Sequence, residues 1–354
     1  MMADQSVMRG HERGAVSADE TILDVHNLSV AFATEGGTLQ AVSDVSFKLH
    51  AGETLALVGE SGSGKSVTSL AIMQLTEPAP RVKVKGTVHF TGRNGRTHNL
   101  LELEEEAMRL IRGNEISMVF QEPMTSLNPV HRIGDQIAES IMFHQRLGAK
   151  AALAQAAELL DRVGIPDARR RLVAYPHHLS GGMRQRVMIA MALACNPRVL
   201  IADEPTTALD VTVQAQILEL FRELQQATGM ALIFVTHNLG VVAEIADSVM
   251  VMYAGAVVEK GGVVPVMTKP RMPYTKGLLN SVPRLYTRSE GLELLEAIPG
   301  AMPDPLRPPP GCAFAPRCDY AEPACERAVP LLEEIGGDRK VRCRRWRIFD
   351  EVQP

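Results

Sequence analysis

The sequence predicts an α/β fold. Short apolar runs with strand character alternate with helical segments along most of the chain, a pattern typical of a sheet covered by helices. A glycine-rich loop stands between one such apolar run and the helix after it, as in sheets that bind an anion at a helix N-terminus. Aromatic residues make up only 4% of the chain, while Met occurs 17 times, which favours aliphatic α/β packing over an aromatic-rich sandwich.

Composition and charge exclude several classes of protein. With 354 residues, 45% of them hydrophobic, the chain can form about two domains, so neither a disordered tail nor a disulfide-stapled miniprotein fits. A net charge of −4 gives no overall basic excess that would indicate nucleic acid or an anionic membrane. Residues 1–20 lack the layout of a secretory signal, and the longest apolar stretch, 187–195, is too short to span a bilayer. We expect a cytoplasmic chain, with any membrane role peripheral.

The first third of the chain predicts strands around the glycine-rich loop. Residues 1–20 are polar without periodicity and are expected to be a flexible leader. Strand-like runs occupy 22–47 and are interrupted by a turn at Gly36 and Gly37. The elements expected next are a buried strand at 54–58, the glycine-rich loop, a helix at 67–75 and a second β region at 86–90.

The middle of the chain predicts a helical insertion at about 95–178. Ile133, Ile137 and Ile141 fall on one helical face, and residues 151–163 continue as a helix that ends at Gly164. The α/β alternation then returns. Its expected elements are a helix at 184–195, a strand at 199–202, a helix at 213–228, and strands at 232–235, 249–253 and 256–259.

These elements predict a division of the chain into three parts. A leader at 1–20 is followed by one nucleotide-type core at 21–265, which the helical insertion interrupts. A C-terminal extension occupies 266–354. Within it, residues 299–310 carry six prolines, which predict a stiff extended linker, and four of the five cysteines follow.

The glycine-rich loop fits the pattern G-x-x-x-x-G-K-[ST] between a predicted strand and a predicted helix. Its residues are Gly59, Glu60, Ser61, Gly62, Ser63, Gly64, Lys65 and Ser66. Glycines let backbone N–H groups point inward, and the helix N-terminus adds its positive end, so the loop can cradle a polyphosphate. Lys65 would reach the β and γ phosphates, and the Ser66 hydroxyl would bind Mg²⁺. The sequence therefore predicts binding of ATP or GTP.

A second motif supports this prediction. The apolar run 199–202 ends in Asp203 and Glu204. Beside a bound nucleotide, Asp203 would hold the Mg²⁺ shell and Glu204 would polarise the attacking water.

The order of motifs resembles the ATP-binding subunit of ATP-binding-cassette (ABC) transporters. The motifs are the phosphate loop, Gln121 after an apolar strand, Leu179-Ser180-Gly181-Gly182, Asp203-Glu204, Ala208-Leu209-Asp210 and His237. The resemblance covers about 22–345. It implies a P-loop ATPase core of the ATP-binding-cassette type, with an inserted helical subdomain and a small Cys-containing C-terminal extension.

The resemblance also implies roles for single residues. Ser180, Gly181 and Gly182 open a helix that would receive the phosphate of an ATP held by the opposite subunit. Gln121 would touch the Mg²⁺ site and sense the membrane subunits. Asp210 would signal between the two ATP sites, and His237 would contact the γ phosphate.

Adenine stacking is assigned to Phe32, which lies 27 residues before Gly59. The alternative is that Phe32 belongs to the core.

Other segments resemble the oligopeptide/dipeptide importer branch of this family. Met183 replaces the Gln that the family's commonest signature carries, and it is followed by Arg-Gln-Arg as in that branch. The segment 121–129 and Pro273-Tyr274-Thr275 are similar to that branch too, although Met272 stands where His is usual.

The branch implies an ATP-hydrolysing subunit that energises an importer of oligopeptides or dipeptides. ATP and Mg²⁺ would be its ligands, at the cytoplasmic face of the inner membrane. The implied partners are two transmembrane permease subunits, a homologous or identical ATPase, and an extracytoplasmic solute-binding protein, with no nucleic acid.

Two alternatives to a peptide importer remain open. Sister systems with similar ATPases import nickel complexes, glutathione or other peptide-like solutes. A non-transport ABC protein of DNA repair or translation is the other alternative. The segment between Ser66 and Leu179 is too short for the long coiled-coil arm of such proteins.

The C-terminal cysteines form a separate candidate site. A cytoplasmic chain keeps thiols reduced, so disulfides are not expected. Cys312, Cys318, Cys325 and Cys343 could bind Zn²⁺ or an iron–sulfur cluster, or could be free thiols. Their pattern is similar to the segment that carries a [4Fe–4S] cluster in peptide-importer ATPases. The fifth cysteine, Cys195, is expected to pack in the core.

Overall fold

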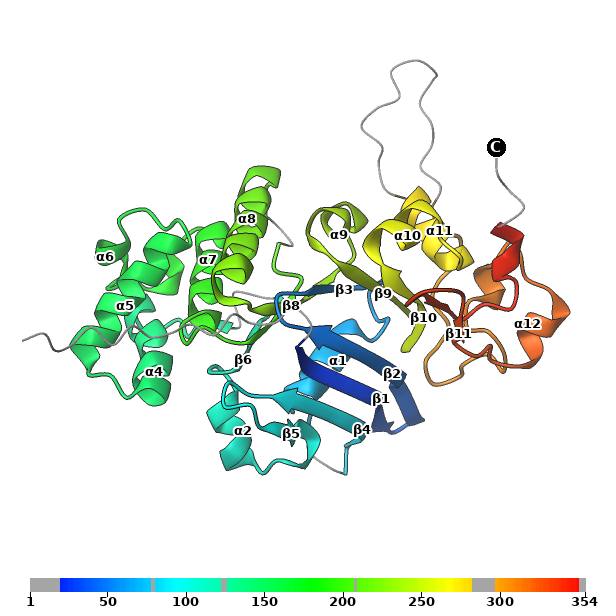
Figure 1. The fold of residues 1–354 in the computed structure, drawn as a ribbon, viewed down its shortest axis with the longest axis horizontal. Coiled ribbons are helices and arrows are strands. Elements are labelled where there is room, and N and C mark those ends of the chain that lie inside the picture. Colours follow the sequence, from blue (N-terminus) through cyan, green and yellow to red (C-terminus); the bar gives the residue numbers. More distant parts are fainter. Residues whose placement is uncertain (1–19, 78–79, 122–125, 207–208, 282–296, 350–354) are drawn as a thin grey trace, which may run out of the picture.

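The computed structural model describes residues 20–77, 80–121, 126–206, 209–281 and 297–349. Most of the predicted leader at 1–20 lies outside these residues, as do parts of 121–129 and Ala208. Two sheets form the centre of the molecule. The helices between residues 133 and 228 lie on one side of them and the C-terminal extension lies on the other (Figure 1).

The larger sheet has eight strands and holds the phosphate loop. Its order is β11 (Glu333–Glu334), β12 (Lys340–Val341), β10 (Ala256–Gly262), β9 (Ser248–Tyr253), β3 (Thr54–Val58), β8 (Ala231–Thr236), β7 (Val199–Asp203) and β6 (Ile116–Val119). The strands from β9 to β6 pair in parallel. Every residue of β3, β7 and β8 is buried, as expected for continuous apolar runs in a parallel sheet covered on both faces.

The smaller sheet is antiparallel and has four strands. Its order is β2 (Gly37–His50), β1 (Thr21–Thr34), β4 (Val82–Thr91) and β5 (Thr97–Asn99). Alternating buried residues of β1 and β2 pack against the larger sheet in one core cluster, which also contains Leu55 and Leu57 of β3.

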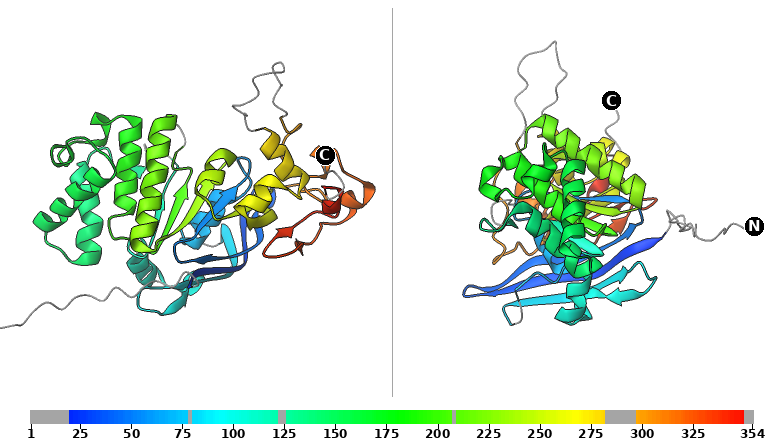
Figure 2. Two further views of the ribbon diagram at one scale, coloured as in Figure 1. Left: turned by 45° about the horizontal axis from the view of Figure 1, so that its top comes forward. Right: turned by 90° about the vertical axis from the view of Figure 1, so that its left-hand side faces the viewer.

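The helices cover the larger sheet and form a separate lobe. They are α1 (Lys65–Ile72), α2 (Glu105–Ile111), α4 (Ile133–Gln145), α5 (Ala149–Arg162), α6 (Ala168–Arg171), α7 (Gly181–Ala192), α8 (Val211–Thr228), α9 (Leu239–Ile245), α10 (Val263–Thr268), α11 (Pro273–Asn280) and α12 (Pro323–Arg327). Helices α4 to α6 extend furthest from the sheets (Figures 1 and 2). Ile133, Ile137 and Ile141 are fully buried on one face of α4, as their spacing predicts.

The α/β fold class is confirmed, and the segment expected to be a helical subdomain, at about 95–178, contains strands as well as helices. The segment 95–178 is not mainly helical from its start, because Thr97–Asn99 and Ile116–Val119 are strands. The run Ile116–Val119 is wholly buried as the outermost parallel strand of the larger sheet. The apolar strand that was expected before Gln121 is thus confirmed, and it pairs in parallel with β7. The continuous helical lobe begins at Ile133.

A separate core cluster attaches the C-terminal extension to the larger sheet. Tyr253 of β9, Tyr274 of α11 and Phe314 pack with ring centroids between 4.6 and 5.4 Å apart. All three are buried. The extension therefore packs directly against β9, which is the neighbour of β3 in the sheet. The phosphate loop follows the C-terminal end of β3.

Candidate active site

The phosphate loop connects β3 to α1, as the motif requires. Gly64 has φ 101°, a left-handed conformation that favours glycine. A Cβ atom there would lie 2.6 Å from the carbonyl oxygen of Ala41. At Gly59, a Cβ would clash with the carbonyl oxygen of Met252. The two glycines thus let the loop pass close to neighbouring backbone, and the N-terminus of α1 points into the site.

Lys65 is the buried cation of the loop. Its Nζ donates hydrogen bonds to the carbonyl oxygens of Gly59 (2.8 Å) and Glu60 (3.0 Å). Burial lowers the pKa of Lys65, and the nearby carboxylates of Glu204 and Asp203 oppose this shift. The ammonium group therefore lies inside the loop, where phosphate oxygens can replace the carbonyl partners.

Asp203 is the last residue of β7 and lies close to Ser66 and Lys65 of the phosphate loop. Burial raises the pKa of Asp203, while a hydrogen bond from the Ser66 side chain and the charge of Lys65 oppose this rise. Its buried Oδ1 accepts no hydrogen bond from the described residues. Mg²⁺ binds oxygen ligands. The buried carboxylate oxygen of Asp203 and the nearby hydroxyl of Ser66 are such ligands. Asp203 and Ser66 thus fit the predicted metal site.

Two side chains that are distant from Glu204 in the sequence contact its carboxylate. Gln121 Nε2 donates to Glu204 Oε2 at 3.1 Å, and His237 Nδ1 lies 3.3 Å from Glu204 Oε1. The Glu204 side chain is 13% exposed and that of His237 is 60% exposed. The predicted residues Gln121, Glu204 and His237 therefore meet at the ends of β6, β7 and β8. Glu204 also has φ 47°, an uncommon conformation that the fold imposes at this point.

A cavity of about 770 Å³ opens beside the loop. Its lining includes Ser61, Lys65 and Ser66 of the loop, together with Gln121 and Glu204. The proline-rich segment also contributes, from Met302 through Pro309. Sequence reasoning missed this wall, since it treated 299–310 only as a linker. The cavity has the size of a ligand site, and polar groups gather at one end of it.

Phe32 does not line this cavity. It lies on β1, where it is partly buried against the core cluster of the two sheets. Phe32 is only partly buried, and it pairs across the sheet with Leu39, which does line the cavity.

Ser180 and Asp210 lie outside the cavity and are exposed. Ser180 is the N-cap of α7, where its Oγ accepts a hydrogen bond from the Met183 N–H at 3.3 Å. A Cβ at Gly181 would meet no atom within 4 Å. The start of α7 is therefore an open helix N-terminus. Asp210 caps α8 in the same way, accepting from the Val213 N–H at 2.9 Å.

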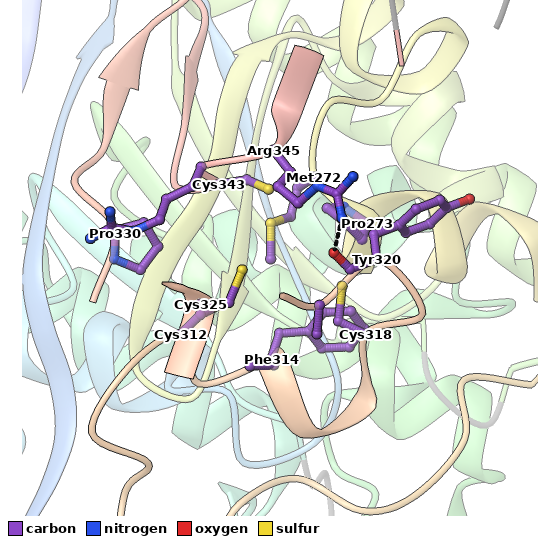
Figure 3. Close-up of a pocket in the computed structure, with 13 residues that line it drawn as sticks. Met272, Pro273, Cys312, Phe314, Cys318, Tyr320, Cys325, Pro330, Cys343 and Arg345 are labelled. Atoms are coloured by element: carbon purple, nitrogen blue, oxygen red, sulfur yellow. Dashed lines mark hydrogen bonds between the residues drawn. The ribbon is translucent and has the colours of Figure 1, made fainter. Parts of the chain in front are cut away.

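The four C-terminal cysteines line one small apolar pocket of about 20 Å³ (Figure 3). Burial raises the pKa of Cys312 and Cys318, and it raises the pKa of Cys343 to about 12. In the described residues, no group of three or more His, Cys, Asp or Glu side chains is arranged to hold a single metal ion. Cys195 is buried in the helical core, as expected.

The fold and this site define a P-loop ATPase. Comparison with family models matches 42–207 to "ABC transporter" and 258–325 to "Oligopeptide/dipeptide transporter, C-terminal region". The chain belongs to the family of ABC-transporter ATP-binding proteins for peptide import, and it is an ATPase coupled to transport.

Curated relatives agree with this family. A putative peptide import ATP-binding protein of Brucella melitensis is 57% identical over 330 residues, covering 92% of this chain and 98% of the relative. The dipeptide transport ATP-binding protein DppD of Bacillus subtilis is 53% identical over 324 residues, covering 92% and 94%.

Solved structures of ABC ATPases share the fold. The dimeric ATP-binding cassette MJ0796, bound to ADP and Pi, has a TM-score of 0.61 and 26% identity, covering 68% of this chain and 99% of that one. CbiO1 of Clostridium perfringens, part of the transporter complex cbiONQ, has a TM-score of 0.57 and 26% identity, covering 71% and 92%. Among the described residues of this chain, no helix is long and apolar enough to cross a membrane.

Proposed function

We propose that this chain binds and hydrolyses ATP at the phosphate loop to energise the import of oligopeptides or dipeptides. The observation that carries the proposal is that Lys65 and Glu204 line the cavity beside the loop, and that the charges of Glu204 and Asp203 both act on Lys65. The loop, from Gly59 to Ser66, would bind the phosphates. Ser66, Asp203 and Gln121 would hold Mg²⁺, which neutralises charge on the β and γ phosphates.

Glu204 is the proposed general base of hydrolysis. Its carboxylate is nearly buried and is oriented by Gln121 and His237, one bonded to each oxygen. A carboxylate held in this way can accept a proton from the attacking water, and His237 beside it would contact the γ phosphate. We propose Phe32, which pairs with the cavity-lining Leu39, as the ring that stacks on adenine.

We propose further that ATP is held between two ATPase subunits. Ser180, Gly181 and Gly182 form an exposed helix start outside the chain's own cavity, so they can complete the site of a second subunit. Asp210 lies at the start of α8, where it can relay the state of one site to the other. The MJ0796 dimers show that related cassettes pair.

The Ser180→Arg variant distinguishes the chain's own ATP cavity from the exposed start of α7, which would complete the site of a second subunit. We expect the isolated variant to bind ATP as the unaltered chain does, because Ser180 lies outside the chain's own cavity. Turnover by the assembled transporter should fall about a hundredfold, since the Arg side chain would block the partner's phosphate. ATP affinity by calorimetry and ATPase rate are the measurements. A loss of ATP affinity in the isolated chain would place Ser180 in its own site and contradict the pairing.

The partners and the location follow from this family. Proteins called peptide import ATP-binding proteins need a membrane-spanning path for the peptide, and no described helix of this chain provides one. We therefore propose two permease subunits, a homologous or identical ATPase and an extracytoplasmic solute-binding protein as partners. The chain would bind peripherally at the cytoplasmic face of the inner membrane. We propose a cassette at 21–265, which includes the first matched range, 42–207, and an extension at 266–354, which includes most of the second, 258–325.

We also propose that the cysteine pocket holds a [4Fe–4S] cluster rather than a single Zn²⁺. All four cysteines line one apolar pocket, and four Cys thiolates are the usual ligand set of such a cluster. The buried thiols have raised pKa values, which a positively charged metal group would reverse. When bound, such a cluster supplies a covalent cross-link between three segments of the extension.

Cys343→Ser and Cys195→Ser form a matched pair for this proposal. We expect anaerobically purified protein to absorb visible light at roughly 400 nm, as iron–sulfur groups do. Cys343→Ser should lose this absorption, and Cys195→Ser should keep it, because Cys195 packs in the helical core. Absorption spectra and metal analysis are the measurements. A colourless anaerobic preparation with one zinc per chain would reject the cluster.

A further inference from the structure

A buried ion pair joins the phosphate loop to the cysteine-containing extension. Arg317 Nη1 lies 2.7 Å from Glu60 Oε2, and Arg317 Nη2 lies 3.0 Å from Glu60 Oε1. The Arg317 side chain is 6% exposed and that of Glu60 is 29% exposed. Two parallel hydrogen bonds between a guanidinium and a carboxylate are the strongest form of this interaction. The loop and the extension are thus connected although 257 positions separate them.

The extension fixes the direction of the Arg317 side chain. Arg317 ends the short helix η3 (Ala315–Arg317) and directly precedes Cys318. Its Nε donates to the carbonyl oxygen of Pro299 at 2.8 Å, and its Nη1 donates to the Tyr253 hydroxyl at 3.3 Å. The guanidinium carbon also lies 5.9 Å from the centre of the Phe314 ring. Because these partners hold the guanidinium, it meets Glu60 in a preorganised position.

A second contact from the extension reaches the same loop residue. The backbone N–H of Glu60 donates to the hydroxyl of Tyr274 at 2.9 Å, and Tyr274 is fully buried in α11. The carbonyl oxygen of Glu60 accepts from Lys65 Nζ. The N–H and the carboxylate of Glu60 are therefore held by the extension, and its carbonyl is held by the lysine that faces the phosphates.

The charge of Glu60 gives this contact a consequence for ligand binding. Glu60 places a carboxylate within a loop that must receive a polyphosphate, and like charges at short range repel. Arg317 neutralises that carboxylate. The bond with Glu60 also raises the pKa of Arg317, so the guanidinium stays charged.

We propose that Arg317 is a positioning residue for the phosphate loop. By holding and neutralising Glu60, Arg317 makes the C-terminal extension part of the ATP-binding unit and sets the ATP affinity of the chain. This inference rests on the proposed ATP site. It assigns to the extension a role in nucleotide binding that does not depend on which group the cysteines hold.

Arg317→Gln, measured with and without Glu60→Gln, tests the inference on the purified full chain. We expect Arg317→Gln to weaken ATP binding about tenfold, because it leaves a half-buried, unpaired carboxylate beside the phosphates. Adding Glu60→Gln should recover most of this loss, since it removes the repelling charge. A purely structural role of Arg317 predicts no such recovery. The measurement is the dissociation constant of ATP by calorimetry.

Arg339→Gln is the matched control. Arg339 belongs to the same extension and pairs with the fully buried Glu259 at 2.6 Å, but it makes no contact with the phosphate loop in the described residues. We expect Arg339→Gln to lower the melting temperature and to leave ATP affinity unchanged. Should Arg317→Gln fail to fold, Arg317→Lys keeps the charge without the two parallel bonds and should weaken ATP binding about threefold.

The ATP-binding measurements distinguish a failure of the proposed ATP site from a failure of the role proposed for Arg317. Unchanged ATP affinity in Lys65→Ala would show that ATP binds elsewhere, and the proposed site would fail. If Lys65→Ala loses ATP, two results overturn the role of Arg317. One is ATP affinity in the Arg317 variant within about twofold of the unaltered chain. The other is a loss of affinity that Glu60→Gln does not repair.

Discussion

Glu204→Gln is expected to reduce ATP turnover at least about a hundredfold while ATP binding persists. The amide keeps the shape of the carboxylate and can still bond with Gln121 and His237, but it cannot accept a proton from the attacking water. The phosphates and Lys65 are untouched, so the ground-state complex still forms. We therefore expect the ATP-bound, paired state to accumulate, because the step that ends it is blocked.

Steady-state ATPase rates and the amount of ATP retained after gel filtration measure this effect. Glu219→Gln is the control, since Glu219 is an exposed carboxylate on α8 that pairs only with Arg222 in the described residues. It should turn over ATP at the unaltered rate. ATP hydrolysis by Glu204→Gln at more than a tenth of the normal rate would show that another group is the base.

Lys65→Ala is expected to abolish ATP binding at micromolar concentrations. The ammonium is the buried cation of the loop, and each charge-assisted hydrogen bond to a phosphate contributes about 1.5–3 kcal/mol. Losing two such bonds weakens binding by about a hundredfold or more. The carboxylates of Asp203 and Glu204 would also lose the neighbouring positive charge that compensates them.

Lys260→Ala controls for the loss of a partly buried lysine. Burial lowers the pKa of Lys260 as it does that of Lys65, but Lys260 lies on β10 near Glu53 and Asp338. We expect this variant to bind ATP normally. Calorimetry with ATP and Mg²⁺ compares the two, with circular dichroism to verify folding. Equal ATP affinity in the two variants would contradict the role of Lys65.

Much of the site could be predicted from the sequence because its motifs are local. The phosphate loop is one continuous segment whose glycines, lysine and serine act within eight residues. Asp203 and Glu204 end a run that is apolar enough to indicate a buried strand. The resemblance to ABC ATP-binding subunits implied that Gln121, Glu204 and His237 share the nucleotide site, and the three side chains do lie together at the ends of β6, β7 and β8.

Features that depend on packing between distant segments could not be predicted. The pairing of β6 with β7 and the wall formed by 302–309 follow from tertiary contacts that no local pattern encodes. Arg317 and Glu60 are another example. An arginine before a cysteine has no sequence signal that points to a loop far away in the chain. The role of Phe32 stays a prediction, because a partly buried ring beside the cavity fits both stacking on adenine and packing against the core.

The central claim is that this ATPase works on membrane partners. Isolation of the tagged, full-length chain from gently solubilised membranes tests it most directly, with mass spectrometry and an ATPase assay on the recovered complex. We predict recovery with two multi-spanning proteins and an ATPase subunit, and ATP turnover that Glu204→Gln removes. Recovery with ribosomes or DNA-repair factors, and with no membrane protein, would leave the ATPase chemistry in place and contradict the transport function.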